Sequence, residues 1–134
     1  MNPPSPYIAT LLVALGGGAG AALRYQAGRF IAALAGVNAA FPWATFTINL
    51  IGSLCMGLLA GGLAKWGPGG ETWRLLIGVG ILGGFTTFSA FSLEMALLME
   101  RGQIALAASY AALSVAGGVA GLFLGLAFMR SMAA

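Results

Sequence analysis

The hydrophobic pattern of the chain consists of four long apolar stretches separated by short connections. The stretches cover about residues 8–34, 42–64, 75–98 and 104–129. A helix needs about 20 apolar residues to cross the hydrocarbon core of a bilayer, so each stretch is long enough. Backbone polar groups must be satisfied inside lipid, and the alternating polarity of barrel strands is not seen here. The pattern therefore predicts transmembrane helices.

The connections and the composition support the same interpretation. The expected turns are residues 36–38, 67–70 and 101–102, and each contains glycine. Hydrophobic residues make up 60% of the chain and charged residues 7%, whereas soluble domains carry about 25% charged residues. We predict an all-α integral membrane protein whose residues 1–134 form a single four-helix transmembrane domain. The first six residues carry no basic side chain, so the first stretch is expected to be a permanent span rather than a signal peptide.

The inventory of reactive side chains excludes several functions. The chain has no His, no Asp and one cysteine, Cys55, and its only acidic residues are Glu71, Glu94 and Glu100. Zinc sites need three or four Cys or His ligands, and Ser-His-Asp or Cys-His catalysis needs a histidine. The six basic residues are spread along the chain and form no nucleic-acid patch. An enzyme is therefore not expected.

The basic residues show no bias between the two sides of the membrane. With four spans, the termini and the second loop share one side, which holds Lys65, Arg74 and Arg130. The opposite side holds Arg24, Arg29 and Arg101. Because a Lys/Arg bias sets orientation, this balance predicts insertion both ways up and an antiparallel, dual-topology homodimer. A single orientation remains the alternative, since counts in such short loops are small.

Small residues recur every fourth position in three of the stretches. The repeats are Gly16, Gly20 and Gly28 in the first, with Arg24 at the remaining position of the series, Ser53, Gly57 and Gly61 in the second, and Gly117, Gly121 and Gly125 in the fourth. Small residues at this spacing let helix backbones approach closely in lipid. We expect these glycines to serve helix packing.

Polar side chains within the stretches are the candidate functional groups. Asn49 shares a helix face with Thr45 and Ser53, and Tyr110 shares one with Ser114. An amide in hydrocarbon must find partners, so Asn49 either lines a polar path or joins helices by hydrogen bonds. Arg24 either faces a water-filled cavity or extends to the interface.

The third stretch contains an unusual segment, GGFTTFSAFS at residues 83–92. Two glycines followed by two β-branched threonines are poor helix formers, so a break in the third helix is expected here. Irregular backbone at membrane depth persists only where it is buried in protein or lines a cavity, and freed carbonyls can coordinate a cation. Phe88 and Phe91 would face one way if the helix resumes.

This segment, the NLIGS run at residues 49–53 and the glycine-rich first stretch ending in Arg24 and Tyr25 resemble the Fluc (CrcB) family of fluoride channels. The resemblance covers essentially the whole chain. It implies an antiparallel dual-topology homodimer in the bacterial inner membrane. It also implies a multi-pass channel that exports fluoride passively and confers fluoride resistance.

The resemblance further implies roles for particular residues. The fluoride pore would contain Asn49, Phe88, Phe91, Thr45, Tyr110 and Ser114, with Arg24 in a vestibule. Backbone carbonyls of Gly83 and Thr86 from each subunit would hold a structural Na⁺ at the dimer interface. This chain departs from the family at Gly118, where the family can carry a further serine four residues after Ser114. The row of hydroxyls is expected to be shorter here.

Physical chemistry is compatible with these roles. A dry pore must replace the water lost by fluoride with donors, which hydroxyl groups and the Asn49 amide supply, while the edges of aromatic rings carry partial positive charge. One alternative is a proton-coupled exporter of cationic drugs, for which Glu94 is the only candidate carboxylate. The favoured interpretation of Glu94 is an interfacial charge. A second alternative is a non-transporting assembly subunit, which leaves Asn49 and the third-stretch segment unexplained.

Overall fold

The computed structural model describes residues 3–36, 39–66 and 70–132. Its helices are α1 (Pro6–Ala35), α2 (Trp43–Trp66), α3 (Glu71–Trp73), η2 (Arg74–Leu82), α4 (Gly83–Phe85), α5 (Phe88–Glu100) and α6 (Ile104–Ser131). The elements α3 to α5 together form a third region, so four helical regions within the described residues are long and apolar enough to cross a membrane. This confirms the prediction of an all-helical, multi-pass membrane protein.

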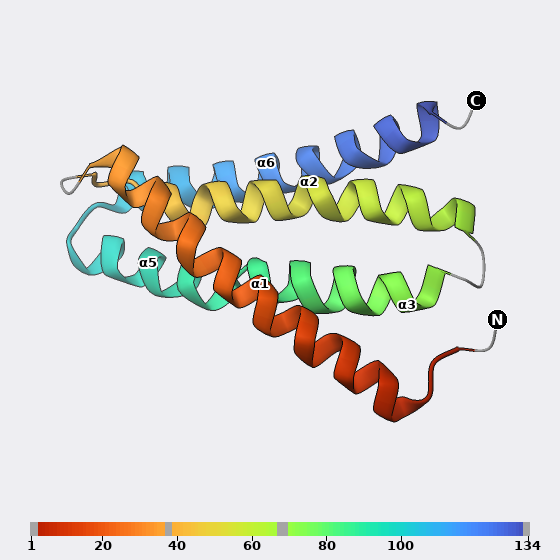
Figure 1. Ribbon diagram of the computed structural model, residues 1–134. Helices are drawn as coiled ribbons and strands as arrows, with labels where there is room; N and C mark the ends of the chain where they lie inside the picture. The colour runs from red at the N-terminus through yellow and green to blue at the C-terminus, as the bar shows by residue number, and fades with distance from the viewer. Residues whose placement is uncertain (1–2, 37–38, 67–69, 133–134) are drawn as a thin grey trace.

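The four regions form an elongated bundle. Helix α2, the third region and α6 run along the length of the molecule, and α1 crosses them obliquely (Figure 1). The start of α1 and the end of α6 lie at the same end of the bundle (Figure 1). This is the arrangement expected when a chain crosses a layer an even number of times.

The third region is not a uniform α-helix. Residues 74–82 form the π-helix η2, a wider helical form that is rare and often lies near functional sites. Helix α4 ends at Phe85, and α5 begins at Phe88. Between them Thr86 and Thr87 have extended backbone angles, with ψ values of 160° and 121°. The π-helix was not expected, because over nine residues the hydrophobic pattern does not distinguish it from an α-helix.

Several glycines of the four-residue repeats lie where helix backbones meet, as their predicted packing role requires, whereas a Cβ at Gly28 would contact only the side chain of Ile48. A Cβ atom added to Gly20 of α1 would lie 2.9 Å from the amide nitrogen of Phe85 in α4. A Cβ added to Gly125 of α6 would lie 2.7 Å from the amide nitrogen of Leu58 in α2. Side chains at these positions would push the helices apart, so glycine sets the separation of α1 from the third region and of α2 from α6.

The predicted loop at residues 101–102 ends α5 tightly. Gly102 has a positive φ of 73°, and its N–H donates to the carbonyl of Met99 at 2.9 Å. The N–H of Gln103 donates to the carbonyl of Leu98, also at 2.9 Å. This pair of bonds is a Schellman motif, which needs glycine at the left-handed position. Residues 37–38 and 67–69 of the other two predicted turns lie outside the described residues.

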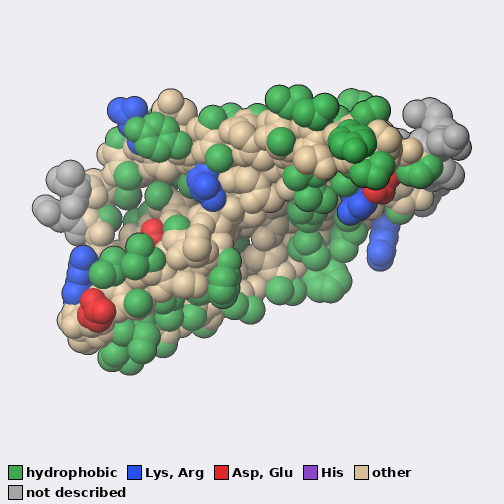
Figure 2. Space-filling view, turned by 90° about the horizontal axis from the view of Figure 1, so that it is seen from below, with side chains coloured by type: hydrophobic (Ala, Val, Ile, Leu, Met, Phe, Trp, Pro, Cys, Tyr) green, Lys and Arg blue, Asp and Glu red, His purple; other side chains and the backbone are tan. Residues whose placement is uncertain are grey.

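Hydrophobic side chains cover much of the surface (Figure 2). Such a surface would drive aggregation in water, whereas lipid chains or a second copy can cover it in a membrane. The protein interior is correspondingly small. Tyr110 is the largest fully buried side chain among the described residues, and it packs with Leu98 and Ala107. The hydroxyl of Tyr110 in this cluster donates to the carboxylate of Glu94.

Candidate functional site

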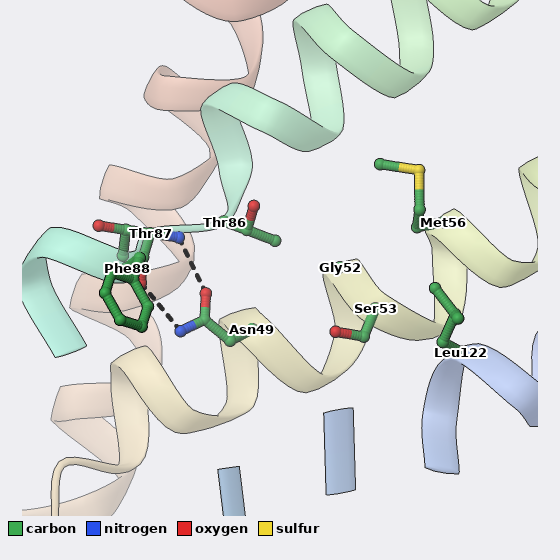
Figure 3. Close-up of a pocket in the computed structure, with 8 residues that line it drawn as sticks. All are labelled: Asn49, Gly52, Ser53, Met56, Thr86, Thr87, Phe88 and Leu122. Carbon is green, nitrogen blue, oxygen red and sulfur yellow. Dashed lines mark hydrogen bonds between the residues drawn. The ribbon is translucent and has the colours of Figure 1, made fainter. Parts of the chain in front are cut away.

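Side chains from two other helices hold the extended residues of the third region. Asn49 of α2 bonds the backbone of Thr87 twice (Figure 3). Its Nδ2 donates to the Thr87 carbonyl at 3.0 Å, and its Oδ1 accepts from the Thr87 N–H at 2.9 Å. From α1, Nη1 of Arg24 donates to the carbonyl of Thr86 at 3.1 Å. Backbone groups released from the helical ladder are thus satisfied by side chains, as lipid requires.

The bond to Asn49 also changes the surroundings of Gly83. In an uninterrupted α-helix the N–H of Thr87 would donate to the carbonyl of Gly83, four residues earlier. Here that N–H donates to Asn49, so the Gly83 carbonyl loses its helical partner. The hydroxyl of Thr87 accepts from the N–H of Ala90 at 3.2 Å and caps the start of α5.

A cavity of about 290 Å³ lies beside this backbone pair (Figure 3). Its polar wall consists of Asn49 and Ser53 from α2 and of Thr86 and Thr87 from the third region, and Phe88 adds an aromatic ring. The amide nitrogen of Asn49 carries two hydrogens. Thr87 accepts one of them, which leaves the second for another acceptor.

A second polar cluster joins α2, α5 and α6 around Glu94. Thr45 Oγ1 donates to Glu94 Oε1 at 2.6 Å, and the hydroxyl of Tyr110 donates to Glu94 Oε2 at 2.7 Å. Both donors are buried. An interfacial charge is the favoured sequence interpretation of Glu94, but the structure places its carboxylate among three helices, where two hydroxyls stabilise it. No sequence pattern indicates that Glu94 lies opposite Thr45 and Tyr110, so the sequence did not predict this cluster.

Ser114 of α6 presents a different situation. It lies one turn along the helix from Tyr110, and its Oγ is buried without a hydrogen-bond partner among the described residues. A buried hydroxyl without a partner costs free energy, so each such group calls for an explanation. A ligand that accepts the hydrogen of the Ser114 hydroxyl would explain why this group has no partner in the protein.

The two phenylalanines of α5 are neighbours, as their spacing predicts. The ring centroids of Phe88 and Phe91 lie 5.6 Å apart. Phe91 packs on Tyr110 with a centroid separation of 4.9 Å, whereas Phe88 is 79% exposed. The chain therefore presents one ring of the pair on its surface, beside the extended residues.

A larger cavity of about 680 Å³ lies between α1, α2 and α5. Arg24 and Arg29 line it together with Thr45 and Ser89, and no carboxylate is among its lining residues. The side chain of Arg24 thus faces this cavity and the backbone of Thr86. Two guanidinium groups give the cavity a positive potential that attracts anions.

Comparison with known proteins supplies relatives for the whole chain. The family model described as "CrcB-like protein, Camphor Resistance (CrcB)" matches residues 11–126. A protein of Novosphingobium aromaticivorans named "Fluoride-specific ion channel FluC" is 66% identical over 125 residues, which cover 93% of this chain and 98% of that protein. A protein of the same name from Erythrobacter litoralis is 56% identical over 136 residues, covering 99% of this chain and 100% of its own length. A third, from Phenylobacterium zucineum, is 54% identical over 123 residues, covering 91% and 95%.

Proposed function

The chain belongs to the CrcB family of fluoride-specific ion channels, and we propose that it exports fluoride passively across the bacterial inner membrane and so confers fluoride resistance. The observation that carries the proposal is the pairing of Asn49 with the extended Thr87 beside a cavity. Irregular backbone at membrane depth is tolerated where it lines such a space. A channel also explains why the polar side chains within the membrane-spanning helices are hydrogen-bond donors and not a catalytic nucleophile paired with a base.

The donors of the proposed pore fall into two groups. Asn49 and Ser114 each retain a hydrogen for which the described residues provide no acceptor. The hydroxyls of Thr45 and Tyr110 donate to Glu94. A hydroxyl has one hydrogen, so these two groups have to rotate away from Glu94 to bind an anion. In this proposal fluoride exchanges its hydration shell for these donors in sequence.

Aromatic and cationic groups have complementary roles in the proposed pathway. The edges of Phe88 and Phe91 carry partial positive charge and assist an anion without binding it tightly. Conduction needs several moderate sites, and a fixed cation inside a narrow pore would hold fluoride too strongly. Arg24 and Arg29 instead line the wide cavity of about 680 Å³, where they raise the local anion concentration as a vestibule does.

The functional unit in this proposal is an antiparallel homodimer of two chains in opposite orientations. Two observations support it. The six basic residues divide three against three between the two sides, and Phe88 is 79% exposed in the protomer although it borders the cavity. A second copy packed against the third region would cover this ring and close the pathway.

A structural Na⁺ at the dimer interface is part of the proposal, and the two carbonyls assigned to it differ in how well they fit. The Gly83 carbonyl suits a hard cation because it has lost its helical partner to the Asn49–Thr87 pair. The Thr86 carbonyl accepts a hydrogen bond from the guanidinium of Arg24. A guanidinium and Na⁺ at one oxygen repel each other, so the proposed site requires Arg24 to turn away from Thr86.

The test is fluoride efflux from proteoliposomes that contain the purified protein, measured with a fluoride electrode. Efflux that exceeds chloride efflux and is indifferent to an imposed pH gradient supports a passive fluoride channel. Slower efflux in the variants Phe88→Ala and Phe91→Ala supports the assigned aromatic pore residues, and unchanged efflux in Asn49→Ala would contradict the assignment of Asn49. Efflux of neither halide, or transport of organic cations driven by the pH gradient, would refute the proposal and would favour a carrier that uses Glu94.

A further inference from the structure

The donors on α6 end at Ser114. Tyr110 and Ser114 lie on one face of the helix, and the next position on that face is Gly118, which has no side chain. The donors of α6 therefore end at Ser114, because the position one helical turn further, about 5.4 Å along the axis, carries no hydroxyl. Ser114 itself has a buried hydroxyl without a described partner, so the row ends on an unused donor.

Helix α2 faces this gap with Ser53. A Cβ atom added to Gly118 would lie 3.4 Å from Oγ of Ser53, so the hydroxyl of Ser53 stands beside the position where a side chain of residue 118 would begin. Ser53 is one turn from Asn49 and lines the same cavity of about 290 Å³ (Figure 3). The close contact between α2 and α6, which their glycines permit, brings the two helices together at this level.

We propose that Ser53 contacts fluoride and supplies the hydroxyl that α6 lacks at position 118. The donors then continue from Ser114 on α6 to Ser53 and Asn49 on α2, which line the cavity. This inference rests on the proposed function and names a further specificity-determining residue for it. A hydroxyl is suited to the role because it donates to a small anion without the fixed charge that would trap it.

The geometry provides a rescue experiment. The variant Ser53→Ala removes the donor, and Gly118→Ser in the same chain returns a hydroxyl to the same space from the other helix. The matched control is Ser53→Ala with Gly118→Ala, which adds the Cβ of residue 118 but no hydroxyl. A distance of 3.4 Å to Ser53 Oγ is an ordinary contact, so the Cβ that both substitutions add at residue 118 fits without moving α2.

Fluoride efflux from proteoliposomes is the readout, with size-exclusion chromatography of each variant as the check on folding. We expect Ser53→Ala to slow efflux about tenfold, which corresponds to about one hydrogen bond to a charged group. Gly118→Ser should return the rate to within about threefold of wild type, and Gly118→Ala should not. If Ser53→Ala does not fold, Ser53→Cys, which keeps the volume but donates weakly, should show the same loss.

Two results would overturn the inference. One is wild-type efflux in a folded Ser53→Ala or Ser53→Cys variant, since the hydroxyl would then have no role. The other is equal rescue by Gly118→Ala and Gly118→Ser, because the effect would then come from packing. Both results presuppose that the wild-type chain conducts fluoride. Failure of the wild-type protein to do so refutes the proposed function itself and is recognised before any variant is compared.

Discussion

The contact between α1 and the third region can be tested by adding one methyl group. Gly20 faces the third region, and a Cβ there would lie 2.9 Å from both the carbonyl carbon of Ile81 and the amide nitrogen of Phe85. These are backbone atoms, so they cannot move aside as a flexible side chain does. Two residues earlier on the same helix, a Cβ at Gly18 would have no atom within 4 Å. Gly18→Ala is therefore the matched control for Gly20→Ala.

The expected difference between the two variants follows from this geometry. Both gain the same helix propensity on replacement of glycine by alanine, about 1 kcal/mol in water, so that term cancels between them. What remains is the overpacking cost at Gly20, about 1–3 kcal/mol. We expect Gly20→Ala to be less stable than Gly18→Ala by that amount, which is about 5- to 150-fold in the unfolding equilibrium constant.

Unfolding in mixed micelles of mild detergent and sodium dodecyl sulfate, followed by circular dichroism, measures this difference. Fluoride efflux should fall in the same order, because a shift of the third region away from α1 also moves Thr86 from Arg24. Light scattering of both variants establishes that they have the same oligomeric state. Equal unfolding midpoints for Gly20→Ala and Gly18→Ala would refute the argument that glycine sets this helix separation.

Three further predictions concern the polar residues. Asn49→Asp keeps an acceptor for the Thr87 N–H but loses the donor and adds a negative charge. Fluoride efflux should therefore fall at least tenfold, and an unchanged rate would contradict the pore role of Asn49. Tyr110→Phe removes one of the two described donors to Glu94 and should lower the free energy of unfolding in mixed micelles by about 2 kcal/mol, whereas no change would show the bond to be dispensable. Arg24→Gln removes a cation from the proposed sodium site, so dimer formation, measured by cross-linking, should need several-fold less Na⁺. The same Na⁺ concentration at half-maximal dimer formation in both proteins would count against the site.

The parts of the fold that the sequence could predict are those that depend on local composition. Four membrane-length helices follow from runs of apolar residues, and the packing surfaces follow from the spacing of glycine. The loop at Gly102 also follows, because a left-handed position favours glycine. Residues 86–87 are extended for a reason that is partly local as well, since two β-branched residues after two glycines disfavour helix.

The features that the sequence could not supply depend on which helices face one another. The carboxylate of Glu94 meets Thr45 and Tyr110 only because α5 packs against both α2 and α6 at that level. The bond from Arg24 to Thr86 spans 62 positions of the chain. In both cases hydropathy identifies a polar residue in an apolar stretch, but its partner is determined by packing.

The hydrogen bonds of the third region decide which experiments can separate structure from conduction. Both ends of the Asn49 amide are bonded to Thr87, and Arg24 is bonded to Thr86. Replacing either polar residue therefore alters backbone that lipid cannot satisfy, and a loss of efflux follows whether or not the residue contacts the anion. Ser53 and Gly118 are different, because the bonds that hold the extended residues come from Asn49 and Arg24. Moving a hydroxyl from α2 to α6 changes the position of a donor while these bonds stay in place. The rate after that exchange, compared with its alanine control, reports on donor chemistry alone.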